Sequence, residues 1–211
     1  RTPDTAVHLI GKNLDFVRSS PGSFKLQPTV TMQNAPQLDV LCVPGGAGVA
    51  ALMEDEEVLE FLRRQAQGAR YLTAVCTGTL VLGAAGLLTG YRATTHWLSL
   101  ELLPLFGAIP TEERVVIDRN RVTGGGVTAG IDFGLTLAAR IFGQETAEDV
   151  QLMMEYAPEP PFHSGSPEQA DSARTERLKN AASARQNERR EIAARAARAL
   201  NATVSNTTRK L

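Results

Sequence analysis

The chain has 211 residues, of which 43% are apolar and 21% charged, and its formal net charge is −1. This size and balance predict one sizeable core with an appendage, and they argue against a nucleic-acid-binding or membrane-binding protein. No apolar run reaches the about 18 residues of a membrane span and no charged-then-apolar leader is visible, so we expect a cytoplasmic protein.

Strands and helices are predicted to alternate along most of the chain. Short apolar runs bounded by turn residues predict strands, and apolar residues spaced three and four apart predict helices. The predicted strands are 5–10, 24–32, 38–43, 71–75, 91–95, 114–118 and 121–125, with turns at Pro21-Gly22 and at 118–120. The predicted helices are 55–67, 77–86, 97–106, which Pro104 is expected to bend or end, and 130–143. This alternation predicts a doubly wound α/β sheet that binds ligands at the carboxyl ends of its strands.

The composition changes after residue 163, which we take as the boundary between an α/β domain (1–163) and a C-terminal helical arm (164–211). Ile192, Ala196 and Leu200 form a thin apolar stripe at helical spacing in a basic segment. We expect this helix to pack along a dimer with its charges solvated. The alternative is a nucleic-acid-binding arm.

The stretch LTAVCTGTLVLGAAGLL (72–88) places Cys76 between a predicted strand and a predicted helix. The positive end of a helix favours a thiolate. Glycine loops at 44–46 and 124–126 follow two other strands, so all three loops are expected to converge at one edge of the sheet. The alternative is that they are ordinary tight turns. Cys42 and Cys76 have no metal-ligand spacing, so we expect neither a disulfide framework nor a metal site.

Five ordered blocks resemble the DJ-1/PfpI superfamily: DVLCVPGGAG, AVCTGTLVLGAAGLLTG, RATTHW, GGGVTAGIDFGLTLAA and EYAPEPPFHSGSP. Within it they are most similar to the isocyanide hydratases. The resemblance implies a flavodoxin-like, mostly parallel sheet of the class I glutamine amidotransferase-like type and a homodimer. It also implies that Cys76 is the nucleophile, that Thr77 organises the site, that Gly45 and Gly46 supply an anion-binding wall, and that neither metal nor organic cofactor takes part.

The function that the resemblance implies is that of a hydro-lyase. The thiolate of Cys76 would attack an isocyanide, and water would release an N-substituted formamide from the resulting thioimidate. Two alternatives stay open: a non-catalytic ligand-sensing or stress-response protein, and a glyoxalase-like hydratase of α-oxoaldehydes. Related blocks also occur in the ligand domains of AraC-type regulators, so fold similarity alone does not decide between them.

The beginning of the chain departs from this family. Members open with a central strand and a loop whose acidic residue hydrogen-bonds the cysteine, whereas this chain opens with RTPDTAVHLIGKN. Asp4 precedes a predicted strand instead of following one, so the acid/base role is not assigned to it. We interpret the chain as N-terminally truncated, with the acid upstream of Arg1, and expect residues 1–211 alone to be marginally stable and nearly inactive.

Three further residues carry expectations. His96 lies twenty residues after Cys76 and is a possible contact of the thiol, although a half-buried histidine at a strand end is commonly structural. Cys42 is expected to be an inert core residue. Asp132 is expected to be a first-turn acid of its helix and not a catalytic group.

Overall fold

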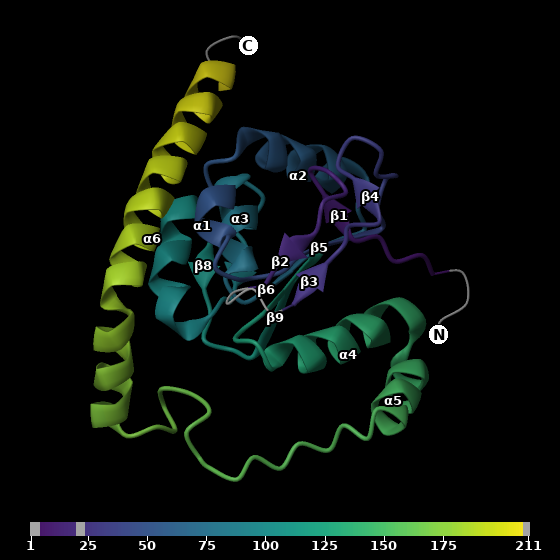
Figure 1. Cartoon of the computed structure of the whole chain (residues 1–211), viewed down its shortest axis with the longest axis vertical. Coiled ribbons are helices and arrows are strands. Elements are labelled where there is room, and N and C mark those ends of the chain that lie inside the picture. Colours follow the sequence, from purple (N-terminus) through teal and green to yellow (C-terminus); the bar gives the residue numbers. More distant parts are fainter. Residues whose placement is uncertain (1–4, 20–23, 209–211) are drawn as a thin grey trace.

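The computed structural model describes residues 5–19 and 24–208, so Asp4 and the turn predicted at Pro21-Gly22 lie outside the described residues. The elements alternate as expected (Figure 1). The strands are β1 Ile10–Gly11, β2 Val17–Arg18, β3 Lys25–Leu26, β4 Val30–Thr31, β5 Val40–Val43, β6 Tyr71–Val75, β7 Arg92–Ala93, β8 Ile109–Pro110, β9 Val115–Asp118 and β10 Arg121–Gly124. The helices are α1 Val49–Leu52, α2 Glu56–Gly68, α3 Gly78–Ala84, η1 Trp97–Phe106, α4 Ala129–Phe142, α5 Gln144–Met153 and α6 Ser172–Thr208.

A four-stranded sheet forms the centre, in the order β5-β6-β10-β9. The first three strands are parallel, and β9 pairs antiparallel with β10 across the predicted turn, where Arg119 has a φ of 54°. Val43 of β5 is opposite Ala74 of β6, and Gly124 of β10 is opposite Val75. The carboxyl ends of three parallel strands therefore meet at one edge, as a doubly wound fold requires.

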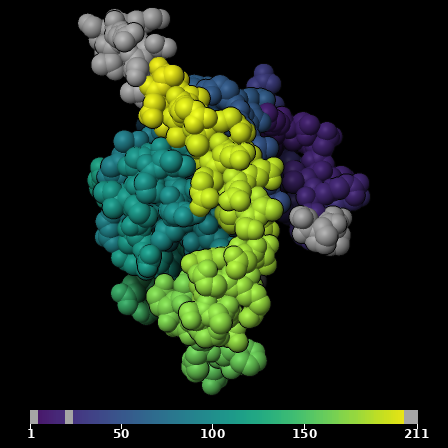
Figure 2. All heavy atoms as spheres, turned by 90° about the vertical axis from the view of Figure 1, so that its left-hand side faces the viewer, coloured from purple at the N-terminus to yellow at the C-terminus, as the bar shows by residue number. Residues whose placement is uncertain are grey.

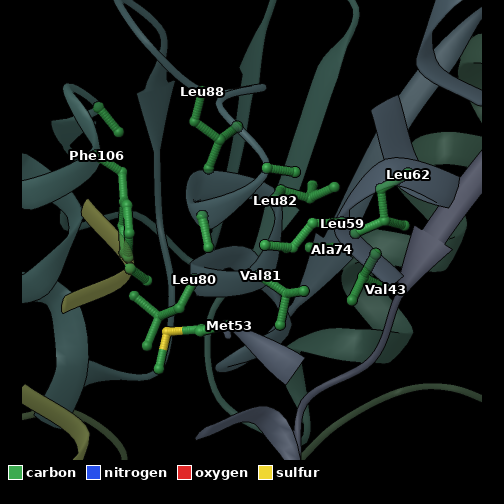
Figure 3. Packing of buried hydrophobic residues seen from close by; sticks show 14 of the residues in the cluster. Val43, Met53, Leu59, Leu62, Ala74, Leu80, Val81, Leu82, Leu88 and Phe106 are labelled. Carbon is green, nitrogen blue, oxygen red and sulfur yellow. The ribbon is translucent and has the colours of Figure 1, made fainter. Parts of the chain in front are cut away.

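Helices cover both faces of this sheet, and Figure 1 shows α2 and α3 on one side of it and α4 on the other. The apolar helix α3 is the centre of the main core. Leu80, Val81 and Leu82 are completely buried. Figure 3 shows them between Phe106 of η1 and Val43 at the end of β5. The helix that follows Cys76 is thus held by packing on both sides.

The strands predicted near the N-terminus are wrong in extent. Of the predicted strand 5–10 only Ile10 is in a strand, β1, which extends to Gly11, and 24–32 is split into β3 and β4 on either side of Pro28. β1 pairs with β4 and β2 with β3, so none of them joins the central sheet. Val7 is 80% exposed, and a proline cannot donate to a strand ladder. Alternation alone does not make a core strand.

Two helices differ from their predictions. Residues 97–106 form a 3-10 helix that contains Pro104 and ends at Gly107 in the left-handed region. Proline removes an α-helical hydrogen bond inside a helix, which favours the tighter winding. The helix α5 was not predicted; it follows α4 directly after Gly143, whose φ of 93° turns the chain.

The long C-terminal helix α6 is confirmed, and its apolar stripe packs on the core of this same chain. Ile192, Ala196 and Leu200 lie in or against that core. The helix contacts α1, α3 and η1, and Figure 2 shows it lying across that face of the molecule. A bidentate ion pair between Arg195 and Glu54 fixes it there, with N–O distances of 2.7 and 2.9 Å.

No helix of the described residues is both long enough and apolar enough to span a membrane.

Candidate active site

Cys76 lies in the turn between β6 and α3, and its backbone is left-handed, with a φ of 58°. Residues with a Cβ rarely adopt this conformation, and such strain concentrates at functional sites. The amide of Cys76 donates to the carbonyl oxygens of Gly124 and Gly125, both at 2.9 Å. Its own carbonyl accepts a hydrogen bond from Thr95 Oγ1 at 2.7 Å. These bonds hold a sharp turn from strand to helix, the kind of turn that presents a nucleophile.

The loop after β5 packs directly on this turn. A Cβ on Gly45 would lie 2.8 Å from the Cβ of Cys76, so only glycine fits there. The amide of Gly46 donates to Thr77 Oγ1 at 3.2 Å. Thr77 is buried, and its hydroxyl donates no hydrogen bond to any described residue. The expected convergence of the loops is therefore confirmed, and the Thr77 hydroxyl keeps a proton that it can donate.

Gly78 makes an equally close approach from the other side. A Cβ there would lie 2.1 Å from the carbonyl oxygen of Val43, the last residue of β5. The sequence predicts Gly78 as part of a loop at this edge of the sheet, but it does not predict the close contact with Val43. The motif CTG itself carried the signal, because a glycine directly after a nucleophile turn commonly permits close packing of helix on strand.

His96 begins η1 and is half-buried. Its Nδ1 accepts a hydrogen bond from the amide of Leu98 at 3.3 Å, so the neutral ring carries its proton on Nε2. Burial lowers the pKa of His96 below the ordinary 6.5, and the positive charges of Arg189 and Arg185 lower it further. No hydrogen bond joins His96 to Cys76 among the described residues. The imidazole is therefore a neutral N–H donor at neutral pH.

Arg189 on α6 is not among the residues that the sequence predicts at the site. Its side chain is only 7% exposed. Its Nη1 donates to Ser99 Oγ at 3.2 Å and to Gln186 Oε1 at 3.1 Å. Burial and Arg185 lower the pKa of Arg189, whereas the negative charge of the Cys76 thiolate acts in the opposite direction. A signal was present in the sequence, because Arg189 lies three residues before Ile192 and so extends the apolar stripe by one turn.

The expectation that Cys42 is a core residue is wrong. Its side chain is exposed on β5, an edge strand of the central sheet as the described residues form it. The packed protein beneath the thiol nevertheless raises the pKa of Cys42, and a hydrogen bond with Thr73 opposes this only in part. Solvent reaches this sulfur from one side while the sheet behind it disfavours the thiolate. The thiol of Cys42 is therefore exposed to solvent and is nevertheless harder to ionise than an ordinary cysteine.

Asp132 is a first-turn acid of α4, as expected. It accepts hydrogen bonds from Arg114 Nε at 2.5 Å and from the hydroxyl of Tyr156 at 3.1 Å. These contacts tie α4 to neighbouring segments and leave the carboxylate occupied. Within residues 5–19 and 24–208, no three His, Cys, Asp or Glu side chains are grouped so that they could hold a metal ion.

Comparison with known proteins gives a consistent result. The family model described as "DJ-1/PfpI family" matches residues 1–140. The isonitrile hydratase of Pseudomonas putida is 58% identical over 199 residues, which cover 94% of this chain and 87% of that protein. A crystal structure of a ThiJ/PfpI family protein from Pseudomonas syringae superposes with a TM-score of 0.86 at 44% identity, over 89% of this chain and 78% of that one.

A transcription regulator also matches part of the chain. The HTH-type transcriptional regulator GbdR of Pseudomonas aeruginosa is 38% identical over 134 residues, which cover 63% of this chain but only 36% of the regulator. This chain therefore matches most of the isonitrile hydratase but only about a third of the regulator.

Proposed function

Because the chain belongs to the DJ-1/PfpI family, we propose that it is a hydro-lyase that hydrates isocyanides to N-substituted formamides, with Cys76 as the nucleophile. One observation carries the proposal: 58% identity to an isonitrile hydratase extends over nearly the whole of both chains. The match to the regulator covers only about a third of that protein. This difference favours the enzyme over the ligand-sensing alternative.

The reaction adds one water molecule to the isocyanide carbon. The Cys76 thiolate attacks the terminal carbon, which takes up a proton to give the thioimidate R–N=CH–S–Cys. Water then adds to that carbon, the sulfur leaves and regains a proton, and R–NH–CHO is released. Nucleophile and proton donor have to lie within about 3 Å of the reacting atoms.

The residues around Cys76 suit these steps. The Thr77 hydroxyl oxygen accepts from the amide of Gly46, so its hydrogen is free to follow the proton transfers at carbon and nitrogen. Gly45 packs closely against the Cβ of Cys76, and the backbone of its loop is the wall that we expect to face the substrate. His96, at the start of η1, is a neutral N–H donor that we propose as a further contact of the substrate. None of these roles needs a metal or an organic cofactor.

The test is hydration of a simple alkyl isocyanide, followed by loss of the N≡C infrared band and by mass detection of the formamide. Cys76→Ser is expected to lower turnover by about 10³-fold or more. Cys42→Ser is the matched control and is expected to keep turnover within about twofold. Absence of formamide with the unchanged protein, or full turnover by Cys76→Ser, would contradict the proposal. Turnover of methylglyoxal in place of the isocyanide would favour the glyoxalase-like alternative.

A homodimer in the cytoplasm is the second part of the proposal. Large apolar side chains stay exposed on α4 and α5, among them Ile131, Leu152 and Met153. Exposed apolar patches of this kind mark contact surfaces. Light scattering is expected to give about twice the chain mass of 22.7 kDa. Leu152→Glu is expected to shift the protein toward monomer, and a monomeric unchanged chain would contradict the dimer.

A further inference from the structure

The hydroxyl of Thr95 makes a hydrogen bond to the backbone of Cys76 that the steps proposed above do not use. Thr95 lies two residues after the short strand β7 and is only 3% exposed. Its Oγ1 donates to the carbonyl oxygen of Cys76 at 2.7 Å, which is close to the optimum for an O–H···O bond. The two residues are 19 positions apart in the chain, so the fold makes this contact and the local sequence does not.

The carbonyl of Cys76 has no other close hydrogen-bond donor among the described residues. The amide of Thr79 also donates to it, but the N–O distance is 3.4 Å, which is long for a hydrogen bond. This carbonyl belongs to the peptide unit that joins Cys76 to Thr77. Because a peptide unit is planar, holding its oxygen restricts the backbone torsion angles on either side of it, ψ of Cys76 and φ of Thr77. Thr95 therefore holds the backbone between the sulfur and the Thr77 hydroxyl.

The left-handed backbone of Cys76, with its φ of 58°, needs such a hold. A residue with a Cβ prefers a right-handed or extended backbone, so this conformation persists only where the surrounding structure fixes it. On the amino side, the amide of Cys76 donates to the carbonyl oxygens of Gly124 and Gly125. On the carboxyl side, Thr95 supplies the short bond. Without that bond, rotation of the peptide unit between residues 76 and 77 would relieve the strain.

Thr95 is itself held firmly in place. The amide of the preceding Thr94 donates to Oγ1 of Thr123 at 2.9 Å, and Thr123 is completely buried in β10. A Cβ on Gly125 would lie 3.9 Å from the carbonyl oxygen of Thr95, so the backbone of Thr95 packs on the loop after β10. The segment is thus anchored to the strand that pairs with β6, which Cys76 directly follows. A hydroxyl on such a rigid backbone is suited to fix a neighbouring group.

We propose that Thr95 is a positioning residue of the active site, whose hydroxyl keeps the peptide unit between Cys76 and Thr77 in the conformation that places nucleophile and proton donor for the reaction. Thr95 acts through this backbone and not on the substrate. The inference rests on the proposed function for the roles of Cys76 and Thr77, whereas the hold of Thr95 on the peptide unit is independent of it.

The first measurement observes that peptide unit directly. Cys76 is the only cysteine of the chain that a threonine follows, so ¹³C in the cysteine carbonyl and ¹⁵N in threonine give a single NMR cross peak between the two nuclei. Thr95→Val keeps the shape of the side chain and removes the hydroxyl. It is expected to move the Cys76 carbonyl resonance to lower chemical shift, the direction of a lost hydrogen bond. Thr73→Val, which removes a buried hydroxyl that donates to the carbonyl of Leu41 at 3.0 Å, is the matched control and is expected to leave the resonance in place.

The second measurement is turnover of an alkyl isocyanide. Thr95→Val is expected to lower kcat by about tenfold or more and to keep KM within about twofold, because a displaced reacting group slows the reaction without removing a substrate contact. Thr95→Ser keeps the hydroxyl and is expected to restore kcat to within about threefold. Thr73→Val is expected to keep both constants within about twofold. If Thr95→Val unfolds, Thr95→Ala is compared with Thr95→Ser, because these two differ only in the hydroxyl.

An unmoved carbonyl resonance, or an unchanged kcat, in a folded variant without the hydroxyl would overturn the inference. Equal loss of kcat in Thr95→Ser and Thr95→Val would overturn it too, because the presence of the hydroxyl would then make no difference. Since the NMR measurement needs no isocyanide, a moved resonance in a chain that hydrates no isocyanide would overturn only the proposed function.

Discussion

Cys42 lies in β5 and Cys76 directly follows the neighbouring parallel strand β6, yet the chain holds the two residues in different ways. Cys42 is in the extended backbone of β5 with its side chain exposed, and the pKa of its thiol is raised. Cys76 is half-buried after the end of β6, in a left-handed backbone between two glycine loops. Because the reactivity of a cysteine depends more on its backbone position and the surrounding charges than on its access to solvent, we expect Cys76 to be the more reactive of the two.

The largest expected effect concerns the close packing that only the Cys76 region has. Gly78→Ala places a Cβ against the carbonyl oxygen of Val43, and we expect the free energy of unfolding to fall by about 3 kcal/mol. Gly134→Ala in α4 meets nothing within 4 Å and is expected to raise it by about 0.5–1 kcal/mol. Urea unfolding measures both. Equal stability of the two variants would show that the turn after Cys76 does not require a glycine at position 78.

A pair of threonine variants tests whether the hydroxyl next to each cysteine contributes to turnover or only to stability. Thr77→Val removes the hydroxyl beside Cys76, and turnover on an isocyanide is expected to fall by about 10²-fold. Thr73→Val makes the same change beside Cys42, where Thr73 Oγ1 donates to the carbonyl of Leu41 at 3.0 Å. It is expected to lower stability by about 1–2 kcal/mol and to leave turnover within about twofold. Steady-state kinetics together with melting curves of both variants decide the point.

Direct labelling of the two thiols is the simplest test of the comparison between Cys42 and Cys76. At pH 7, iodoacetamide is expected to alkylate Cys76 at least about tenfold faster than Cys42, although Cys42 is the more exposed. Peptide mass spectrometry after short reaction times gives the two rates in one sample. Faster labelling of Cys42 would mean that exposure governs these thiols after all.

The smallest effect is a pH dependence at the edge of the Cys76 region. The folded protein lowers the pKa of His96 below 6.5, so the unfolded chain binds more protons at that position. This contribution to stability is fully present above pH 6.5 and is lost as the pH falls through the folded value. His96→Gln is expected to flatten the loss of stability between pH 7 and 5, whereas His163→Gln, at an exposed position, is not. If stability falls equally with pH in the His96→Gln and His163→Gln variants, the predicted contribution of His96 is wrong.

The sequence predicts the central fold well because the buried strands and the helix α3 are local, strongly apolar patterns. It also locates the site, since Cys76 and the glycine loops end neighbouring parallel strands. It fails where distant segments decide the outcome. The exposure of Cys42 depends on which strand lies at the edge of the sheet. Arg189 is buried because α6 folds back on η1, and no pattern around residue 189 contains that partner.

The packing of α6 against the sheet domain also affects the rate at which the protein folds. Arg195 is 141 residues away from its partner Glu54, and Ala193 belongs to the same core as Leu80. Folding rates fall as the contacts of a protein join more distant parts of the chain, because the loop has to close before its contacts stabilise it. A nascent chain that has already made the whole sheet still exposes the apolar sides of α3 and η1 to its surroundings. Completion of the core is therefore a late step that waits for residues 189–200 to be synthesised.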